Sequence, residues 1–347
     1  VGGDLSLQDN YVVETLDLGQ LTEVGGGLRF SNWQYLEALD LYSLDSVGEY
    51  VYLYNCDEVE ELDLSGVSFD GDYVEIRYND RLEAVLLPDL VTLTGRLDIS
   101  ENPSLVDLDL SALESVGGTL TVQNSYDLEE LDLSSLVDVG GDLSLYSLNE
   151  VEELDLASLE TVVGTLRLYY MDGVVELDLS GLTELGGLYL YDNEDLESLD
   201  VGGLSEMSQG VWIYYNYNLT ELDFGSLETA GTVYVYGQYY TSDLDLGALT
   251  TVTSSLILYD VDQVDDLDLG DLETVGGSLQ IQYLDNLQSL DLGVLTEVGG
   301  SFYLRYLPDL TSLDVDQLSS VGSTFYIYYL GSLSTLDFGD LEDVGGS

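Results

Sequence analysis

Apolar residues recur along the chain with a period of about 23 residues. One unit reads V-G-G-x-L-x-L-x(5)-L-x-x-L-D-L-x-x-L-x-x, with apolar residues at positions 1, 5, 7, 13, 16, 18 and 21. Positions 5 and 7 alternate with polar residues, as do 16 and 18, and a period of two is typical of a strand with one buried face. No stretch sustains the 3.6-residue period of an amphipathic helix. Each unit is therefore predicted to form two short strands and two corners.

The units follow one another without a linker, and the array spans residues 1–347 as a single domain. A unit of this kind cannot bury its apolar side alone, so its strands are expected to pair in parallel with the same positions of the next unit. The spacing is 23 residues, except for two units of 22 residues that start at Leu185 and Ala230. The first residues of the fifteen units and of a four-residue remnant are Val1, Val24, Val47, Asp70, Leu93, Val116, Val139, Val162, Leu185, Met207, Ala230, Val252, Val275, Val298, Val321 and Val344.

Glycine pairs follow the first residue of most units. Glycine fits a corner that needs a positive φ or a close approach between stacked backbones. The first and last segments, VGGDLSL and LEDVGGS, lie within the repeat, so we expect uncapped ends, as in a segment of a longer chain or a filament subunit.

Segments such as NPSLVDLDLSALESVGGTL (102–120) and LEAVLLPDLVTLTGRLDISENPSL (82–105) resemble the repeats of the receptor L-domain superfamily, which includes fungal cell-wall and bacterial surface proteins. The resemblance covers the whole array. It implies an all-β, right-handed parallel β-solenoid of fifteen coils, similar to leucine-rich repeats and without a unique cleft. It also implies an extracellular or cell-surface location, with a role in wall structure, adhesion or ligand recognition.

Charge narrows the choice of partner. The chain has 68 Asp and Glu, six Arg, no His and a net charge of −62, while 45% of its residues are hydrophobic. The apolar content predicts a folded protein, and the charge excludes nucleic acid and anionic membranes as direct partners. No segment is long and apolar enough to insert into a membrane. Cys56, the one cysteine, is interpreted as a spacer in a loop.

An aspartate column is predicted at position 17, which points outward between two inward residues. Fourteen units carry Asp there and Leu86 is the exception. Several units also carry an acidic residue at position 15, which gives pairs such as Glu221 and Asp223. Molar salt, bound Ca²⁺ or raised pKa values could offset the repulsion, and alternatively Asp only keeps an exposed strand soluble. The candidate cation stripe comprises Asp109, Asp132, Asp155, Asp178, Asp200, Asp223, Asp245 and Asp268.

Tyrosines form a second outward column. The 28 tyrosines concentrate at position 8, with further aromatic residues at positions 6 and 9. Such a ladder stabilises the sheet by stacking, and it also suits a contact surface, because tyrosine is apolar at one end and polar at the other. The candidate contact surface comprises Tyr146, Tyr169, Tyr191, Tyr214, Tyr236, Tyr259 and Trp212.

The function expected from these features is structural or adhesive and not enzymatic. Repeated carboxylates offer no pair with distinct environments, which acid–base catalysis requires. We expect an extracellular filament or cell-surface fibre subunit that associates with itself and is stabilised by salt or divalent cations, with no cofactor other than cations such as Ca²⁺. The alternative is a recognition module that binds a glycan or a surface protein. Asn218, in Asn-Leu-Thr, is a candidate glycosylation site.

Two local breaks in the repeat favour the recognition alternative. The first spans units 3 to 5, where Asp70, Leu86, Pro88, Arg77, Arg81 and Arg96 lie. Its arginines are expected to neutralise nearby carboxylates or, alternatively, to bind an anion. The second spans units 9 to 11, which contain the two shorter units and Trp212.

Overall fold

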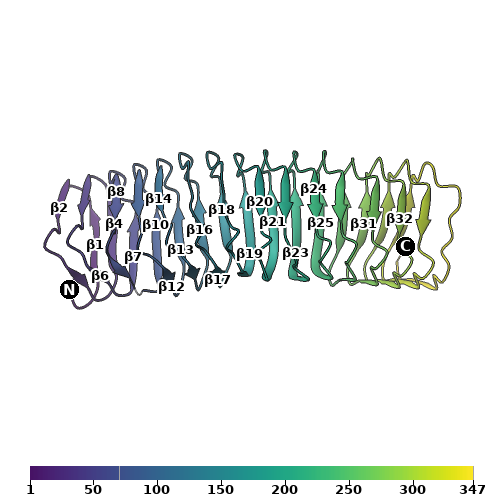
Figure 1. The fold of residues 1–347 in the computed structure, drawn as a ribbon, viewed down its shortest axis with the longest axis horizontal. Helices are drawn as coiled ribbons and strands as arrows, with labels where there is room; N and C mark the ends of the chain where they lie inside the picture. The colour runs from purple at the N-terminus through teal and green to yellow at the C-terminus, as the bar shows by residue number, and fades with distance from the viewer. Residues whose placement is uncertain (70, 347) are drawn as a thin grey trace. The chain divides into compact units, whose positions relative to one another are not determined.

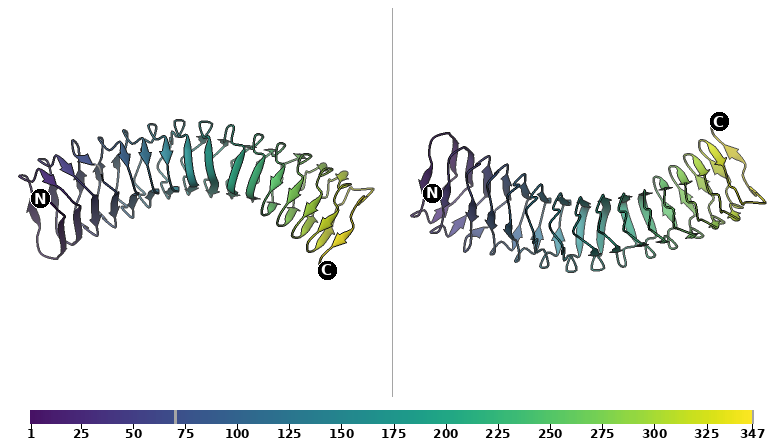
Figure 2. Two further views of the ribbon diagram at one scale, coloured as in Figure 1. Left: turned by 90° about the horizontal axis from the view of Figure 1, so that it is seen from below. Right: turned by 90° about the horizontal axis from the view of Figure 1, so that it is seen from above.

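The structure, a computed structural model, describes residues 1–69 and 71–346, so Asp70 lies outside the described residues. Its described residues form only strands, turns and bends, with no helix (Figure 1). They divide into two compact units, Val1–Val174 and Val175–Ser347. Each unit is a stack of parallel coils, about 15 in the two together, which confirms the predicted all-β solenoid (Figure 2).

A coil has up to three strands where the sequence predicted two, although no strand forms at positions 15–17 around Asp132, Asp155 and Asp337. The third is the two-residue strand at positions 23 and 1, which is too short to show a period of its own. The strands of the first unit are β1 (Leu5–Asn10), β2 (Thr15–Asp17), β3 (Glu23–Val24), β4 (Leu28–Trp33), β5 (Ala38–Asp40), β6 (Ser46–Val47), β7 (Tyr50–Tyr54), β8 (Glu61–Asp63), β9 (Ser68–Phe69), β10 (Tyr73–Arg77), β11 (Ala84–Leu86), β12 (Thr92–Leu93), β13 (Leu97–Ser100), β14 (Asp107–Asp109), β15 (Ser115–Val116), β16 (Leu120–Gln123), β17 (Asp138–Val139), β18 (Leu143–Tyr146) and β19 (Thr161–Tyr169).

The second unit repeats this order. Its strands are β20 (Glu176–Asp178), β21 (Glu184–Tyr191), β22 (Ser198–Asp200), β23 (Glu206–Tyr214), β24 (Glu221–Asp223), β25 (Thr229–Tyr236), β26 (Asp243–Asp245), β27 (Thr251–Val252), β28 (Leu256–Tyr259), β29 (Asp266–Asp268), β30 (Thr274–Val275), β31 (Leu279–Gln282), β32 (Ser289–Asp291), β33 (Glu297–Val298), β34 (Phe302–Arg305), β35 (Ser312–Asp314), β36 (Ser320–Val321), β37 (Phe325–Tyr328) and β38 (Asp343–Val344).

Equivalent positions of successive coils pair directly, as the repeat predicted. Leu97 of β13 pairs with Leu120 of β16, which pairs with Leu143 of β18, and all three side chains are fully buried. The apolar positions of each unit therefore form continuous ladders of Leu, Val, Ile and Phe, and burying each Leu contributes roughly 1.5–3 kcal/mol. These ladders fix which side chains face outward.

Glycine is required at these corners because the backbones of successive coils approach each other closely there. A Cβ atom added to Gly140 would lie 2.3 Å from the carbonyl oxygen of Gly117, and one added to Gly299 would lie 2.2 Å from that of Gly276. Among the described glycine-pair corners, only Gly210 has a positive φ, of 122°. A positive φ occurs instead at position 9, which the sequence analysis missed. The residues with positive φ there are Asp9, Asn32, Asn55, Tyr78, Glu101, Asn124, Ser147, Tyr170, Asp192, Tyr215, Gly237, Asp260, Tyr283, Tyr306 and Tyr329.

The register departs from the predicted repeat in two places. Phe69, and not Asp70, pairs with Val47, so Phe69 takes the position of the first valine in its coil. Around the two shorter units, β21, β23 and β25 run through the corner as single strands of eight or nine residues. A register shift between Met207 and Gly210 absorbs the missing residue there.

Candidate functional site

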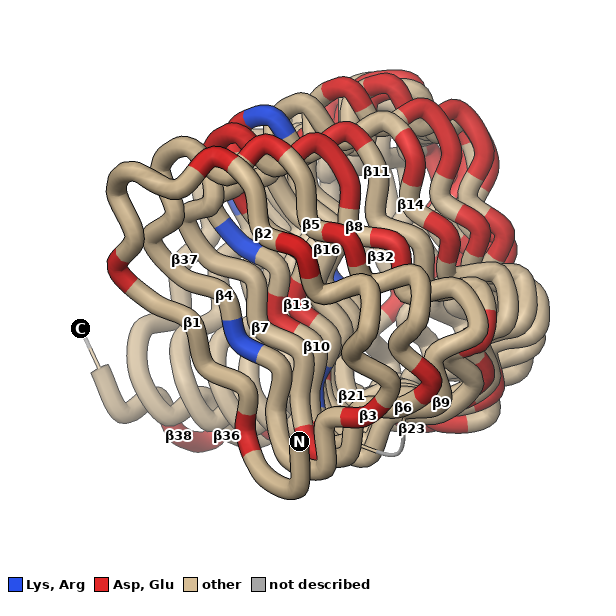
Figure 3. The backbone as a smooth tube through the Cα atoms, turned by 90° about the vertical axis from the view of Figure 1, so that its left-hand side faces the viewer, with Lys and Arg blue, Asp and Glu red and all other residues tan. Residues whose placement is uncertain are grey.

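Most residues of the predicted aspartate column lie on strands at positions 15–17, with their side chains pointing outward, whereas Asp132, Asp155 and Asp337 lie outside any strand. Asp200 of β22 pairs with Asp178 and Asp223, and Asp223 pairs with Asp245. Within the first unit, Asp17 pairs with Asp40 in the same way, and acidic positions (red) accompany β2, β5 and β8 in Figure 3. The residues of the candidate cation stripe are exposed, except Asp109, which is half-buried.

Each aspartate of this column accepts a hydrogen bond from the backbone two residues further along the chain. In Asp223 the Oδ1 atom accepts from the N–H of Gly225 at 2.8 Å. All fourteen bonds measure between 2.8 and 3.3 Å, and the acceptors are Asp17, Asp40, Asp63, Asp109, Asp132, Asp155, Asp178, Asp200, Asp223, Asp245, Asp268, Asp291, Asp314 and Asp337. This is an Asx turn, in which the side chain takes up a backbone donor that the corner leaves unpaired.

The coil without this aspartate also lacks the donor. Leu86 replaces Asp, and the residue two further on is Pro88, which has no backbone N–H. The corner still closes through the N–H of Leu90, which donates to the carbonyl oxygen of Leu87 at 3.1 Å. Acceptor and donor are therefore lost together, which indicates that the hydrogen bond determines the residue at position 17.

Serine two residues after the aspartate strengthens this turn. The Ser134 hydroxyl donates to Asp132 Oδ1 at 2.6 Å, in addition to the Ser134 N–H at 3.0 Å. Hydrogen bonds to the charged carboxylate hold the pKa of Asp132 below its ordinary value, and Ser180 does the same to the pKa of Asp178. These two carboxylates are therefore more firmly ionised than free ones.

Acidic side chains also line an open groove in the first unit. The groove has a volume of about 780 Å³, and its residues are Glu129, Glu130, Leu131, Asp132, Ser134, Glu150, Glu152, Glu153 and Asp155. Among residues 1–69 and 71–346, no three His, Cys, Asp or Glu side chains converge as a metal-binding group. The carboxylates thus lie in rows, each beside its neighbours of the same charge.

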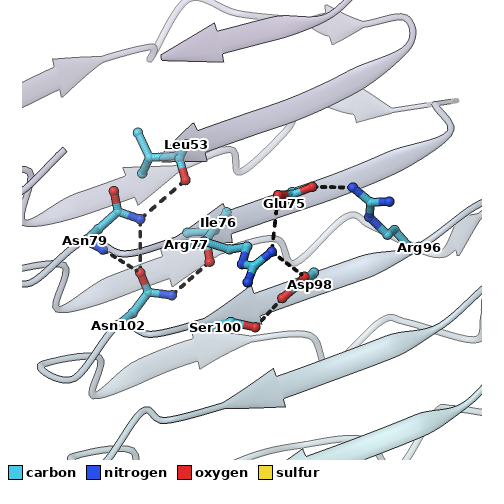
Figure 4. A network of polar contacts seen from close by, with 9 residues as sticks. All are labelled: Leu53, Glu75, Ile76, Arg77, Asn79, Arg96, Asp98, Ser100 and Asn102. Atoms are coloured by element: carbon cyan, nitrogen blue, oxygen red, sulfur yellow. Dashed lines mark hydrogen bonds and ion pairs between the residues drawn. The ribbon is translucent and has the colours of Figure 1, made fainter. Parts of the chain in front are cut away.

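A polar network occupies the predicted break of units 3 to 5 (Figure 4). Glu75 is 7% exposed, and its carboxylate pairs with the guanidinium groups of Arg77 and Arg96. The distance from Arg77 Nη1 to Glu75 Oε1 is 3.7 Å. Arg77 also pairs with Asp98 at 3.6 Å. Arg81 pairs with Glu58. These ion pairs confirm the expected neutralisation of neighbouring carboxylates.

Buried asparagines form a ladder behind this network, which the sequence analysis missed. Asn79 and Asn102 are fully buried, and the Nδ2 atom of Asn79 donates to Oδ1 of Asn102 at 3.0 Å. In the second unit, Nδ2 of Asn193 donates to Asn216 Oδ1 at 2.9 Å. The signal in the sequence was an Asn one residue after the position with positive φ. Cys56 occupies this same position, in the loop between β7 and β8 where the sequence analysis placed it, and its side chain is fully buried.

The residues of the predicted tyrosine contact surface are half-buried, with one side of each ring packed against the sheet. In the first unit the rings of Tyr146 and Tyr169 contact each other at 4.5 Å. In the second unit the centroid of the Tyr214 ring lies 5.4 Å from that of Tyr189 and 4.9 Å from that of Tyr234. The remaining contacts in this ladder are Tyr189 with Trp212 at 5.8 Å, Tyr191 with Tyr214 at 6.2 Å, Tyr214 with Tyr236 at 6.5 Å and Tyr236 with Tyr259 at 5.1 Å.

The ladder continues along position 9 towards the end of the second unit. Ring centroids are 5.0 Å apart for Tyr259 and Tyr283, 4.7 Å for Tyr283 and Tyr306, and 5.6 Å for Tyr306 and Tyr329. Asn218, the candidate glycosylation site, is exposed in a turn of this unit. The second unit therefore presents one aromatic row over all of its coils from β21 to β37.

Comparisons with known proteins do not assign a family. No family model matches the chain, and no curated protein matches it. The described residues contain no helix long and apolar enough to cross a membrane.

Proposed function

We propose that the protein is a non-catalytic structural or adhesive component of an extracellular or cell-surface layer, assembled as a filament or fibre. The observation that carries this proposal is the register, in which equivalent positions of successive coils pair, so that buried positions stay apolar and Asp recurs in one outward column. Such a surface offers rows of identical groups to a partner. A strand edge in this register also accepts a further coil of the same kind, from its own chain or another copy.

The carboxylate column supports a non-catalytic role. Acid–base catalysis needs two titratable groups whose environments separate their pKa values. The aspartates at position 17 instead share one type of contact, because each accepts a backbone hydrogen bond from the residue two further along the chain. Their repetition is suited to solvation and cation attraction along the whole surface.

Salt or divalent cations would stabilise this arrangement. Neighbouring parallel strands lie about 4.8 Å apart, and two unit charges at about 4 Å repel by about 1 kcal/mol in bulk water. In molar salt the screening length falls to about 3 Å, which removes most of this repulsion. Calcium is suited to bridging carboxylate oxygens that the Asx turns leave unoccupied.

Sedimentation velocity and thermal unfolding test this proposal. We expect the purified chain to melt at a higher temperature and to form larger species as sodium chloride rises. Replacing part of the sodium chloride by calcium chloride at equal ionic strength tests for specific calcium binding. Equal melting temperatures in the two solutions would exclude that role, and a monomer under all conditions would contradict the filament.

A recognition module of the receptor L-domain kind is the second candidate. It is favoured by the local break at β21, β23 and β25, where long strands carry Trp212 and neighbouring tyrosines. In this case one face of the second unit would bind a glycan or a surface protein.

A further inference from the structure

The aromatic face of the second unit, taken from the first residue of each coil to the residue before the position with positive φ, is free of acidic residues, which lie only at its margins, such as Glu184, Glu206, Asp192 and Asp260. It consists of seven strand segments, and none contains Asp or Glu, in a chain with 68 such residues. The segments are 185–191, 207–214, 230–236, 252–259, 275–282, 298–305 and 321–328. Their outward side chains are Tyr, Trp, Ser, Thr, Gln and Ile257, with Arg305 as the one charged residue.

Neutrality is not a property of this strand position in general. The equivalent segments of the first unit contain acidic residues, which are Asp4, Glu49, Asp72, Glu75, Asp98 and Asp142 among the described ones. There Tyr50 stacks on Tyr73 at 5.0 Å, with its hydroxyl 3.4 Å from Asp4. Stacked tyrosines therefore tolerate nearby carboxylates, and ring stacking alone does not explain their absence from the second unit.

Around β21, β23 and β25 two pairs of neighbouring rings lie nearly parallel, whereas Tyr214 and Tyr236 meet edge-on at 72°. The rings of Tyr189 and Trp212 are inclined by 19°, and those of Tyr214 and Tyr234 by 29°. A Cβ atom at Gly187 would lie 3.4 Å from the Trp212 ring, and one at Gly210 would lie 2.1 Å from the carbonyl oxygen of Thr232. Half-buried rings on close-packed backbones give a rigid platform of apolar ring surfaces with hydroxyl groups among them.

We propose that this neutral face, centred on Tyr191, Trp212, Tyr214 and Tyr236, binds an uncharged polysaccharide. Pyranose rings present apolar C–H faces that stack on aromatic rings, and their hydroxyls match tyrosine, serine and glutamine side chains. Burying a carboxylate beneath a sugar would remove its water at a cost, which explains why the face excludes acids. This inference rests on the proposed extracellular role, because it supplies the partner to which the protein adheres.

Charge argues against the alternative occupants. A second copy would bring another net charge of −62, and long-range repulsion between the copies opposes face-to-face contact. An acidic polysaccharide is opposed for the same reason. A neutral polymer incurs no such repulsion, and a long one extends over successive coils.

Affinity electrophoresis tests the inference on the full chain. Native gels contain hydroxyethylcellulose, galactomannan or dextran as neutral probes, and carboxymethylcellulose as the matched charged probe. We expect at least one neutral polymer to retard the protein, with binding at least tenfold weaker to carboxymethylcellulose. Absence of retardation by all three neutral polymers would overturn the inference, as would equal retardation by hydroxyethylcellulose and carboxymethylcellulose.

Two triple variants locate the binding face. Changing Tyr191, Tyr214 and Tyr236 to Ser should weaken binding at least tenfold, whereas changing them to Phe keeps the rings and should keep most of it. The matched control is Tyr50→Ser with Tyr73→Ser, which removes a stacked pair beside carboxylates and should leave binding unchanged. Unchanged binding by the Ser triple variant would overturn the inference. If that variant does not fold, Tyr214→Ser alone replaces it and the same outcomes apply.

The outcomes separate this inference from the proposed function. Sedimentation without polysaccharide shows whether the triple Ser variant loses self-association, in which case the face contacts a second copy and the glycan assignment is wrong. Filaments that form without glycan binding would leave the structural role standing alone.

Discussion

Replacing Asp223 separates the two effects that an aspartate of the column has on stability. Its Oδ1 atom accepts the Gly225 N–H at 2.8 Å, and its strand pairs with those of Asp200 and Asp245. Asp223→Ala removes both the acceptor and the charge. Asp223→Asn removes the charge and keeps a side-chain oxygen that can accept the same bond.

The expected magnitudes differ in their dependence on salt. Loss of a side-chain acceptor for a backbone N–H costs about 1 kcal/mol, in a range of about 0.5–2 kcal/mol. Each neighbouring carboxylate contributes about 1 kcal/mol of repulsion in water at low salt, and little in molar salt. We therefore expect Asp223→Asn to be more stable than the parent by roughly 1–2 kcal/mol at low salt and nearly equal at high salt. Asp223→Ala should be less stable than Asp223→Asn by about 1 kcal/mol at both low and high salt.

Urea denaturation and amide hydrogen exchange measure these differences, since urea adds no ions. Exchange at the Gly225 amide reports the turn itself, and a loss of about 1 kcal/mol should accelerate it about fivefold in Asp223→Ala. If Asp223→Asn destabilised the protein as much as Asp223→Ala, the hydrogen-bond explanation of the column would be refuted. If the effect of Asp223→Asn did not change with salt, the repulsion argument would be wrong.

Three other predictions follow from the same turns and the core. Leu86→Asp should destabilise the protein by roughly 1–2 kcal/mol at low salt in urea denaturation, because it adds a charge between Asp63 and Asp109. Adding Pro88→Ser supplies the missing N–H donor and should recover about 1 kcal/mol of this loss. Ser134→Ala should raise the pKa of Asp132 towards its ordinary value, as measured by NMR titration. The stability that the Ser134 contact gives is fully present above the pKa of Asp132 in the unfolded chain, and it is lost as the pH falls through the lower pKa of Asp132 in the folded protein. Burial raises the pKa of the Cys56 thiol to about 12, so iodoacetamide should leave it unmodified in the native protein and alkylate it in urea, and fast native alkylation would contradict the buried position.

The sequence predicted the fold well because buried and outward positions repeat with one period. Leu97, Leu120 and Leu143 occupy one ladder, and the aspartates stand outward as expected. The third strand of each coil escaped prediction, because two residues such as Glu23 and Val24 carry no periodicity. The register at Phe69 was also missed. Val47 and Phe69 are 22 residues apart and the next unit is longer, and in the sequence this cannot be distinguished from two 23-residue units with a degenerate first residue at Asp70.

The site was only partly predictable. The charge of the aspartate column suggested cations, whereas its most direct role is a hydrogen bond to the backbone. The signal for that role was the joint change at Leu86 and Pro88, which a view based on charge alone does not explain. The positive φ at position 9 was hidden because Tyr215 and Tyr283 adopt it alongside asparagines and aspartates. The neutral face becomes apparent only when the strand register shows which segments share one side.

Electron microscopy of the purified protein tests the central claim, a structural protein that assembles through the strand edges of its stacked coils. Images at high salt with calcium should show long filaments of uniform width, and removal of calcium by a chelator, followed by dilution of the salt, should shorten or dissolve them. Single particles of one chain under all of these conditions would contradict the filament and favour a surface-tethered binding module.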